Sequence, residues 1–226
     1  MATLGEYLGA GSGTTKLLLH LNGDSTDSSG NGNNGTDTNI TYVDGKFGKC
    51  ASFRSNYDSY INVPNLGIGT NDFTINFIIK PANFVDGNCY YFSANASSHP
   101  WNELRLLQAP VTSAGLRVNH YNGSTDLALE VNQSKISTTQ FNYITVTRIS
   151  DTLSIYVNGN LEASGTGWSG RNCSGGYRQM IGKINDATAG DSFYGLMDEC
   201  IVELGGWSAE EVKKYYTQSR GFYATL

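Results

Sequence analysis

A loop rich in Asn, Asp and Gly, residues 22–35, carries the side chains best suited to hold a cation. Asp24, Asp27 and Asn31 offer hard oxygen ligands of the kind that Ca²⁺ prefers, alongside backbone carbonyl groups. The same side chain types also close Asx-turns and accept hydrogen bonds from backbone amides. The loop is therefore either a cation cradle or a polar loop held in shape by its own side chains.

Aromatic side chains form the second group with binding chemistry. A sugar-binding site needs an aromatic face for the apolar side of the ring, with Asn, Asp and Gln nearby for the hydroxyl groups. Tyr91 and Trp101 lie in one aromatic stretch, and Trp168 and Tyr177 lie in another. These four residues are the predicted glycan contacts. The alternative is that they pack in the core, because the chain contains 14 tyrosines.

The sequence patterns of catalytic sites do not occur. Glycoside hydrolysis on a strand needs two carboxylates in a spacing such as E-x-D-x-E, so that alternate side chains face one cleft. Asp198 and Glu199 are adjacent instead, and a regular strand would point them to opposite faces. The histidines lie far apart, outside any G-x-S-x-G or H-E-x-x-H motif. The sequence therefore predicts a protein that is not an enzyme.

Composition and charge exclude further classes. The 226 residues carry a net charge of −5 without a cluster of Lys or Arg, whereas nucleic-acid binding requires a basic face. No apolar run approaches about 18 residues, so no membrane insertion is expected. The N-terminus lacks the basic and apolar regions of a secretory signal. The four cysteines form no C-x-x-C pair, which favours free thiols, with two disulfides as the alternative.

The elements that must position these residues are short strands separated by turns. Strands are predicted at 16–21, 41–43, 50–53, 60–63, 73–80, 89–93, 103–108, 116–121, 126–131, 142–149, 152–157, 161–164, 177–181 and 195–204. Asn158-Gly159 predicts a type I′ hairpin turn, and the capping box of Ser208 and Glu211 predicts one short C-terminal helix. Residues 1–14 are predicted to form a flexible N-terminal arm, and 15–226 one β-sandwich domain.

Four stretches, within 19–36, 48–81, 142–159 and 181–212, together resemble the laminin-G-like, concanavalin A-like jelly-roll family. They include Leu19-His-Leu-Asn-Gly-Asp24 and Gly195-Leu-Met-Asp-Glu199. The resemblance implies an all-β, two-sheet antiparallel jelly-roll β-sandwich, in which strand 195–204 pairs beside the N-terminal strand. It also implies a structural Ca²⁺ at the rim, with Asp198 joining Asp24 and Asp27 as ligands. Cys50 and Cys200 are then expected on neighbouring strands as buried thiols.

Two function classes fit such a domain. The first is a virion surface protein, a capsid decoration or tail-associated protein of a bacteriophage. It would dock on a viral shell protein and also hold glycans, and the absence of a leader fits a virion location. The second is a secreted or cell-surface, lectin-like carbohydrate-binding module with an extracellular location. Both hypotheses leave room for self-association through exposed sheet edges.

Overall fold

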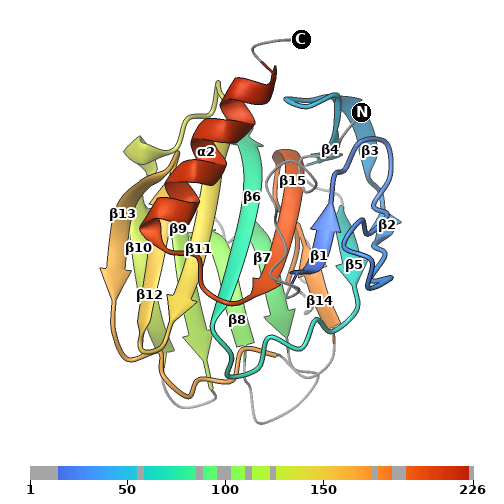
Figure 1. Cartoon of the computed structure of the whole chain (residues 1–226). Coiled ribbons are helices and arrows are strands. Elements are labelled where there is room, and N and C mark those ends of the chain that lie inside the picture. The colour runs from blue at the N-terminus through green and yellow to red at the C-terminus, as the bar shows by residue number, and fades with distance from the viewer. Residues whose placement is uncertain are drawn as a thin grey trace.

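The computed structural model describes residues 15–54, 59–84, 89–95, 103–109, 114–122, 126–174, 178–184 and 192–223. Within these ranges, two antiparallel sheets pack face to face, one in front of the other in Figure 1. The prediction of an all-β, two-sheet sandwich with one C-terminal helix is confirmed. The predicted N-terminal arm, 1–14, lies outside the described residues.

The front sheet, sheet A, has the strand order β13-β12-β11-β6-β15-β4-β3, and β1 also pairs with β15. Its strands are β1 (Thr15–Leu19), β3 (Thr41–Asp44), β4 (Lys49–Phe53), β6 (Phe73–Pro81), β11 (Asn142–Ile149), β12 (Thr152–Val157), β13 (Asn160–Gly165) and β15 (Gly195–Leu204). The antiparallel register runs from Thr15 opposite Glu203 to Leu19 opposite Cys200, which confirms the expected pairing of the two ends of the fold.

The rear sheet, sheet B, has the strand order β10-β9-β8-β7-β14-β5-β2. Its strands are β2 (Thr36–Thr38), β5 (Tyr60–Val63), β7 (Cys89–Asn95), β8 (Glu103–Ala109), β9 (Ala114–Tyr121), β10 (Asp126–Asn132) and β14 (Arg178–Ile181). A 3-10 turn, η1 (Gln133–Lys135), follows β10. The sequence did not predict β2, because Thr-Asp-Thr is too short and polar to show an alternating pattern.

Alternation along the strands fills the space between the sheets with apolar side chains. Leu116 and Val118 of β9 and Ile144 and Val146 of β11 are all fully buried in this core. Each such side chain contributes about 1.5–3 kcal/mol when it is removed from water. The four cysteines are buried free thiols, and Cys50 and Cys200 lie on the paired strands β4 and β15, as expected.

The predicted turn and helix are both present. Asn158 and Gly159 have φ angles of 53° and 75°, the left-handed pair that a type I′ turn requires. Before helix α2 (Ala209–Tyr223), the Ser208 N–H donates to Glu211 Oε2 at 2.7 Å, and the Glu211 N–H donates to Ser208 Oγ at 3.3 Å. This capping box starts the helix, which therefore begins at the predicted place.

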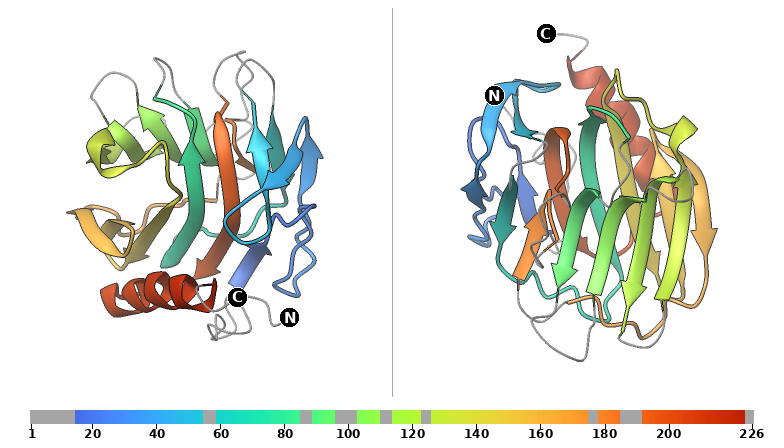
Figure 2. Two further views of the ribbon diagram at one scale, coloured as in Figure 1. Left: turned by 90° about the horizontal axis from the view of Figure 1, so that it is seen from above. Right: turned by 180° about the vertical axis from the view of Figure 1, so that it is seen from behind.

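Helix α2 lies over the outer face of sheet A, in front of β11 and β6 in Figure 1. Figure 2 shows the molecule from behind, where sheet B faces the viewer and α2 lies on the far side. The two sheets therefore differ in what covers their outer faces. No helix among the described residues is long and apolar enough to cross a membrane.

Candidate functional site

Asp27, a predicted calcium ligand, holds the polar loop against β1. Its Oδ1 accepts the backbone N–H groups of Leu18 at 3.0 Å and Ser29 at 2.9 Å, and its Oδ2 accepts that of Asn33 at 2.8 Å. Burial raises the pKa of Asp27, but these hydrogen bonds outweigh burial and leave it below its usual value. Asp27 thus acts as an acceptor that shapes the loop, which is the alternative role considered for this stretch.

Asp24 and Asp198 also accept hydrogen bonds from backbone amides. Asp24 Oδ1 accepts the Thr26 N–H at 2.9 Å, which is an Asx-turn. Asp198 Oδ2 accepts the N–H groups of Lys46 at 2.7 Å and Phe47 at 2.9 Å. Burial raises the pKa of Asp198 to about 7, against the opposing effect of these hydrogen bonds. Asp198 therefore ties the loop before β4 to the middle of β15.

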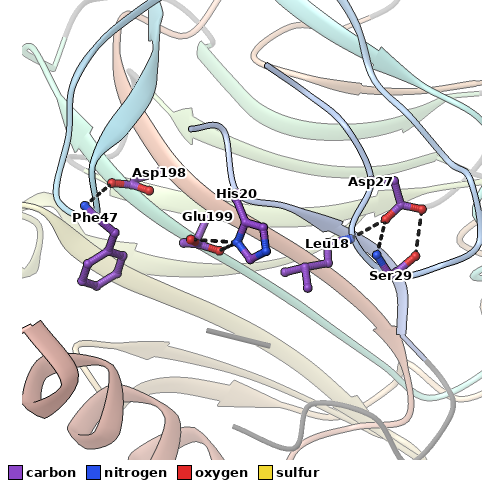
Figure 3. Close-up of polar contacts among 7 residues, drawn as sticks. All are labelled: Leu18, His20, Asp27, Ser29, Phe47, Asp198 and Glu199. Atoms are coloured by element: carbon purple, nitrogen blue, oxygen red, sulfur yellow. Dashed lines mark hydrogen bonds and ion pairs between the residues drawn. The ribbon is translucent and has the colours of Figure 1, made fainter. Parts of the chain in front are cut away.

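The three predicted calcium ligands accept hydrogen bonds from different backbone segments. Figure 3 shows Asp27 beside Leu18 and Asp198 beside Phe47, with a different pair of side chains, His20 and Glu199, between them. Asp198 Oδ1 is buried without a partner, but Ca²⁺ requires about six to eight oxygens. The described residues contain no group of three His, Cys, Asp or Glu side chains suited to a metal ion. In the structure Asp24, Asp27 and Asp198 each accept backbone hydrogen bonds, and a calcium site at these residues stays a prediction.

The His20–Glu199 pair was not anticipated. His20 Nδ1 lies 2.9 Å and 3.1 Å from the two carboxylate oxygens of Glu199, a side chain that is buried. A bulge at Glu199, with φ of 53°, interrupts the alternation that a regular strand would impose on Asp198 and Glu199. The pair joins the end of β1 to the centre of β15, so its geometry serves the closure of sheet A.

Two of the predicted glycan contacts lie in the core. Tyr91 has no exposed surface, and its hydroxyl donates to the Gly115 carbonyl at 3.1 Å. Trp168 is 1% exposed and belongs to the same core cluster. Neither ring presents a face to a ligand, because burial of its apolar surface stabilises the sandwich instead. Trp101 and Tyr177 lie outside the described residues, so their predicted role stays a prediction.

Polar side chains gather instead on the outer face of sheet B, over β8, β9 and β10. On β9, Leu116 and Val118 point into the core, so the alternate residues Arg117, Asn119 and Tyr121 point outward. The register places Glu103 opposite Tyr121 and Arg105 opposite Asn119, which extends this outward row onto β8. We name the set the polar band: Glu103, Arg105, Arg117, Asn119, Tyr121, Asp126 and Glu130.

Ion pairs connect the polar band across its strands. Arg117 contacts Asp126 at 2.8 Å and Glu130 at 3.5 Å, both on β10. Asn119 Nδ2 donates to Asp126 Oδ1 at 2.8 Å. The contact with Glu130 follows from the register, because Arg117 lies directly opposite Glu130, and Asn119 lies two residues from Tyr121, the partner of Asp126.

The β8 side of the polar band is deeper. Arg105 pairs with the buried carboxylate of Glu103, and its guanidinium lies 5.8 Å from the centre of the Tyr121 ring. Arg105 is 25% exposed at its side chain, whereas Glu103 is 1% exposed. The band therefore has a buried floor on β8 and a half-exposed side on β9 and β10.

Several polar atoms of the band are buried and make no hydrogen bond. These are the acceptors Glu103 Oε1 and Asn119 Oδ1 and the donors Arg105 Nε and Arg117 Nε. Buried polar groups in folded proteins are nearly always satisfied, so each exception needs a physical explanation. The sequence signal for the band was weak, because polar residues at alternate positions of a strand also describe an ordinary solvated face.

Two antiparallel sheets packed face to face and closed by β15 beside β1 define a concanavalin A-like jelly-roll sandwich. Residues 54–213 match the Laminin_G_3 family, described as the concanavalin A-like lectin/glucanases superfamily. The chain belongs to this family, as the laminin-G-like resemblance predicted. No curated protein matches the chain in a sequence comparison.

Solved structures with the same fold include bacterial binding domains. Domain 4 of an extracellular arabinanase from Geobacillus stearothermophilus, in complex with arabinotriose, has a TM-score of 0.72 at 21% identity and covers 90% of this chain and 98% of its own. The binding domain of Paraclostridial Mosquitocidal Protein 1 has a TM-score of 0.73 at 19% identity, over 91% of this chain and 52% of its own.

A third structure concerns botulinum neurotoxin type C, whose cell entry is described as dependent upon interaction with two ganglioside molecules. Its TM-score is 0.68 at 15% identity, over 91% of this chain and 51% of its own. The present chain thus spans about half the length of the two toxin structures. At these identities the likeness shows the shared fold.

Proposed function

We propose that this chain is a non-catalytic carbohydrate-binding module and that a saccharide lies on the polar band of sheet B. The observation that carries the proposal is the set of buried, unpartnered donors and acceptors in that band. Such an atom costs about 1–3 kcal/mol when nothing satisfies it. A sugar hydroxyl both donates and accepts, so a saccharide can supply partners for acceptors such as Glu103 Oε1 and for donors such as Arg117 Nε.

The shape and chemistry of the band support a ring-shaped polar ligand. Tyr121 is partly exposed within it and supplies an aromatic surface for the apolar side of a sugar ring. Arg117, Asp126 and Glu130 surround that position with half-exposed planar groups. Planar side chains fixed by their neighbours lose little conformational entropy when they bind, which favours affinity for a weakly binding ligand.

The comparisons support the same function. The arabinanase domain, of which this chain covers nearly the full length, was solved with arabinotriose. The neurotoxin structure, of which this chain spans about half, is described with gangliosides, whose sialylated head groups support saccharide binding in general but not a particular ligand class. Of the two hypotheses from the sequence, the lectin-like carbohydrate-binding module therefore has the better support, and an extracellular location goes with it.

A non-catalytic role agrees with how the carboxylates of the band are held. Glycosidases place two carboxyl groups across the scissile bond, one as acid and the other as base or nucleophile. In the polar band, Glu103 is paired with Arg105, and Asp126 and Glu130 share Arg117. Each carboxylate therefore serves to fix an arginine, which is a binding arrangement.

The virion hypothesis has no specific observation in its favour, since none of the structures named above is described as a virion protein. It stays a prediction, together with the virion location, the capsid or tail partner and self-association. Detection of the chain in purified virus particles would support it independently of saccharide binding.

Isothermal titration of the full chain with arabinotriose and a panel of neutral oligosaccharides tests the proposal. We expect at least one saccharide to bind and Arg117→Gln to lower its affinity by about tenfold, the loss of one charged hydrogen-bonding group. The matched control is Arg54→Gln, because Arg54 is exposed at the end of β4 on the other sheet. Equal loss in both variants, or no binding by any saccharide, would contradict the proposal.

A further inference from the structure

We propose that the polar band selects neutral saccharides and rejects carboxylated ones, such as those with sialic or uronic acid groups. This inference rests on the proposed saccharide site. It concerns the ligand class, which the fold leaves open, because concanavalin A-like sandwiches provide only a frame for a site. The argument depends on the partners of the two arginines and on the polarity of the unpartnered atoms.

Both arginines of the band already hold carboxylates from the chain itself. Arg117 lies between Asp126 at 2.8 Å and Glu130 at 3.5 Å. Arg105 is paired with Glu103, whose side chain is 1% exposed. An anionic sugar that used either arginine would have to displace one of these carboxylates. A displaced buried carboxylate such as Glu103 would be left without its counter-charge, which is strongly unfavourable.

The negative charge of the band and of the whole chain also disfavours carboxylated ligands. The band presents two guanidinium groups and three carboxylates, so its own charge is negative when all are ionised. The whole chain also carries a net charge of −5. A carboxylated ligand therefore meets like charge on approach and at the site, and like-charge contacts lower affinity for the wrong partner.

The unpartnered acceptors also discriminate between sugar hydroxyls and ionised carboxylates. Glu103 Oε1 and Asn119 Oδ1 need a hydrogen-bond donor, and they belong to buried residues of the band. A sugar hydroxyl donates a proton to such an oxygen, whereas an ionised carboxylate has no proton to donate. Among the unpartnered atoms of the band, only the two Nε–H groups could donate to a carboxylate, and both belong to guanidinium groups that already hold one.

The test compares neutral sugars with their carboxylated counterparts. The full chain is titrated with arabinotriose, with lactose and sialyllactose, and with xylotriose and its glucuronic acid-substituted form. At a low ionic strength of about 20 mM, we expect each carboxylated member to bind at least about tenfold more weakly than its neutral partner. Because repulsion is screened by salt, the difference should shrink at about 150 mM salt.

A charge variant provides the second measurement. Glu130→Gln removes one carboxylate from Arg117, so we expect the preference for neutral ligands to fall by about threefold or more. The matched control is Glu210→Gln, because Glu210 is an exposed residue of the first turn of α2. This control removes the same charge from the chain, and we expect it to leave the preference for neutral ligands unchanged.

The outcomes separate the two proposals. If a carboxylated sugar binds as well as its neutral partner or better, the selectivity is overturned, while the saccharide site stands. If no sugar of either kind binds, the proposed function fails and the selectivity fails with it. If Glu130→Gln and Glu210→Gln change the preference equally, the discrimination comes from the overall charge, and the role given to Arg117 and its partners is overturned.

Discussion

In both sheets of the sandwich, side chains alternate between the core and the outer face, but the two outer faces differ in what covers them. On sheet A, the outward side chains of Leu18, Ile78, Tyr143 and Ile201 pack in one cluster with Phe47 and with Tyr215 of α2. On sheet B, β8, β9 and β10 present the polar band, with half-exposed ion pairs. The chain thus covers the first face with its own helix, whereas the second face carries the proposed saccharide site. Substitutions on the first should change stability, and substitutions on the second should change binding.

The largest effect is expected at Tyr215, which is 4% exposed between α2 and sheet A. Its ring lies 5.2 Å from that of Trp207 and 6.3 Å from that of Tyr143. Tyr215→Ala removes these contacts and leaves a cavity, so we expect the free energy of unfolding to fall by about 3–5 kcal/mol. Denaturant unfolding measures this loss, and saccharide affinity under folding conditions should stay within about twofold of the parent.

The matched control for this variant is Tyr194→Ala, because Tyr194 is 37% exposed. We expect that control to cost less than about 0.5 kcal/mol. A Tyr215→Ala protein that kept its stability but lost saccharide binding would reverse the roles assigned to the two faces.

An intermediate effect, dependent on pH, is expected at Asp198 on the outer side of sheet A. Burial raises the pKa of Asp198 from 3.8 to about 7. Between these values the native state binds more protons than the unfolded state, so the free energy of unfolding falls as the pH rises through this window. The total change from this group is at most about 4 kcal/mol. Asp198→Asn should remove this part of the pH dependence, as measured by unfolding between about pH 4 and pH 8.

Burial also raises the pKa of Glu199, which faces His20, so a residual slope of the same sign should remain in Asp198→Asn. The control is Asp44→Asn, an exposed carboxylate at the end of β3, which should leave the profile unchanged. A melting temperature that depends on calcium in the parent and not in Asp198→Asn would contradict this account and support a cation at Asp198.

The smallest effect on stability is expected for Arg117→Gln, the variant that should weaken saccharide binding. The Arg117 side chain is 28% exposed and its partners Asp126 and Glu130 are more exposed still. Exposed ion pairs contribute little, so we expect a loss below about 1 kcal/mol in denaturant unfolding. A loss as large as that of Tyr215→Ala would show that the polar band is a structural element, and the contrast between the faces would then disappear.

Much of the fold could be predicted because its signals are local. Asn142–Ile149 and Thr152–Val157 have the bounds that alternation and turn residues indicated. The capping box at Ser208 located the start of α2 from residues within one helical turn. The bulge at Glu199 could not be predicted, because it depends on the register between β15 and β6.

The candidate site was harder to predict than the fold. Tyr91 was a plausible sugar contact, but an irregular register on β7, between Tyr90 and Phe92, accompanies its place in the core. The polar band needs side chains from β8, β9 and β10 in a particular register, and that information is not local to any one strand. The sequence predicted the acidic loop as either a cation cradle or a turn, and the structure adds the backbone hydrogen bonds of Asp27, which no local pattern specified.

The pairing of β1 with β15 has a consequence for how the chain folds. Thr15 pairs with Glu203, so the contact joins residues that are separated by nearly the whole described sequence. Contacts of such long sequence separation form slowly, because the entropy of closing the intervening loop must be overcome first. During synthesis β1 emerges early and has no edge to join until β15 has left the ribosome. Sheet A is therefore completed only after β15 is made, and apolar side chains of β1 that are buried in the folded chain lack their β15 partner until then.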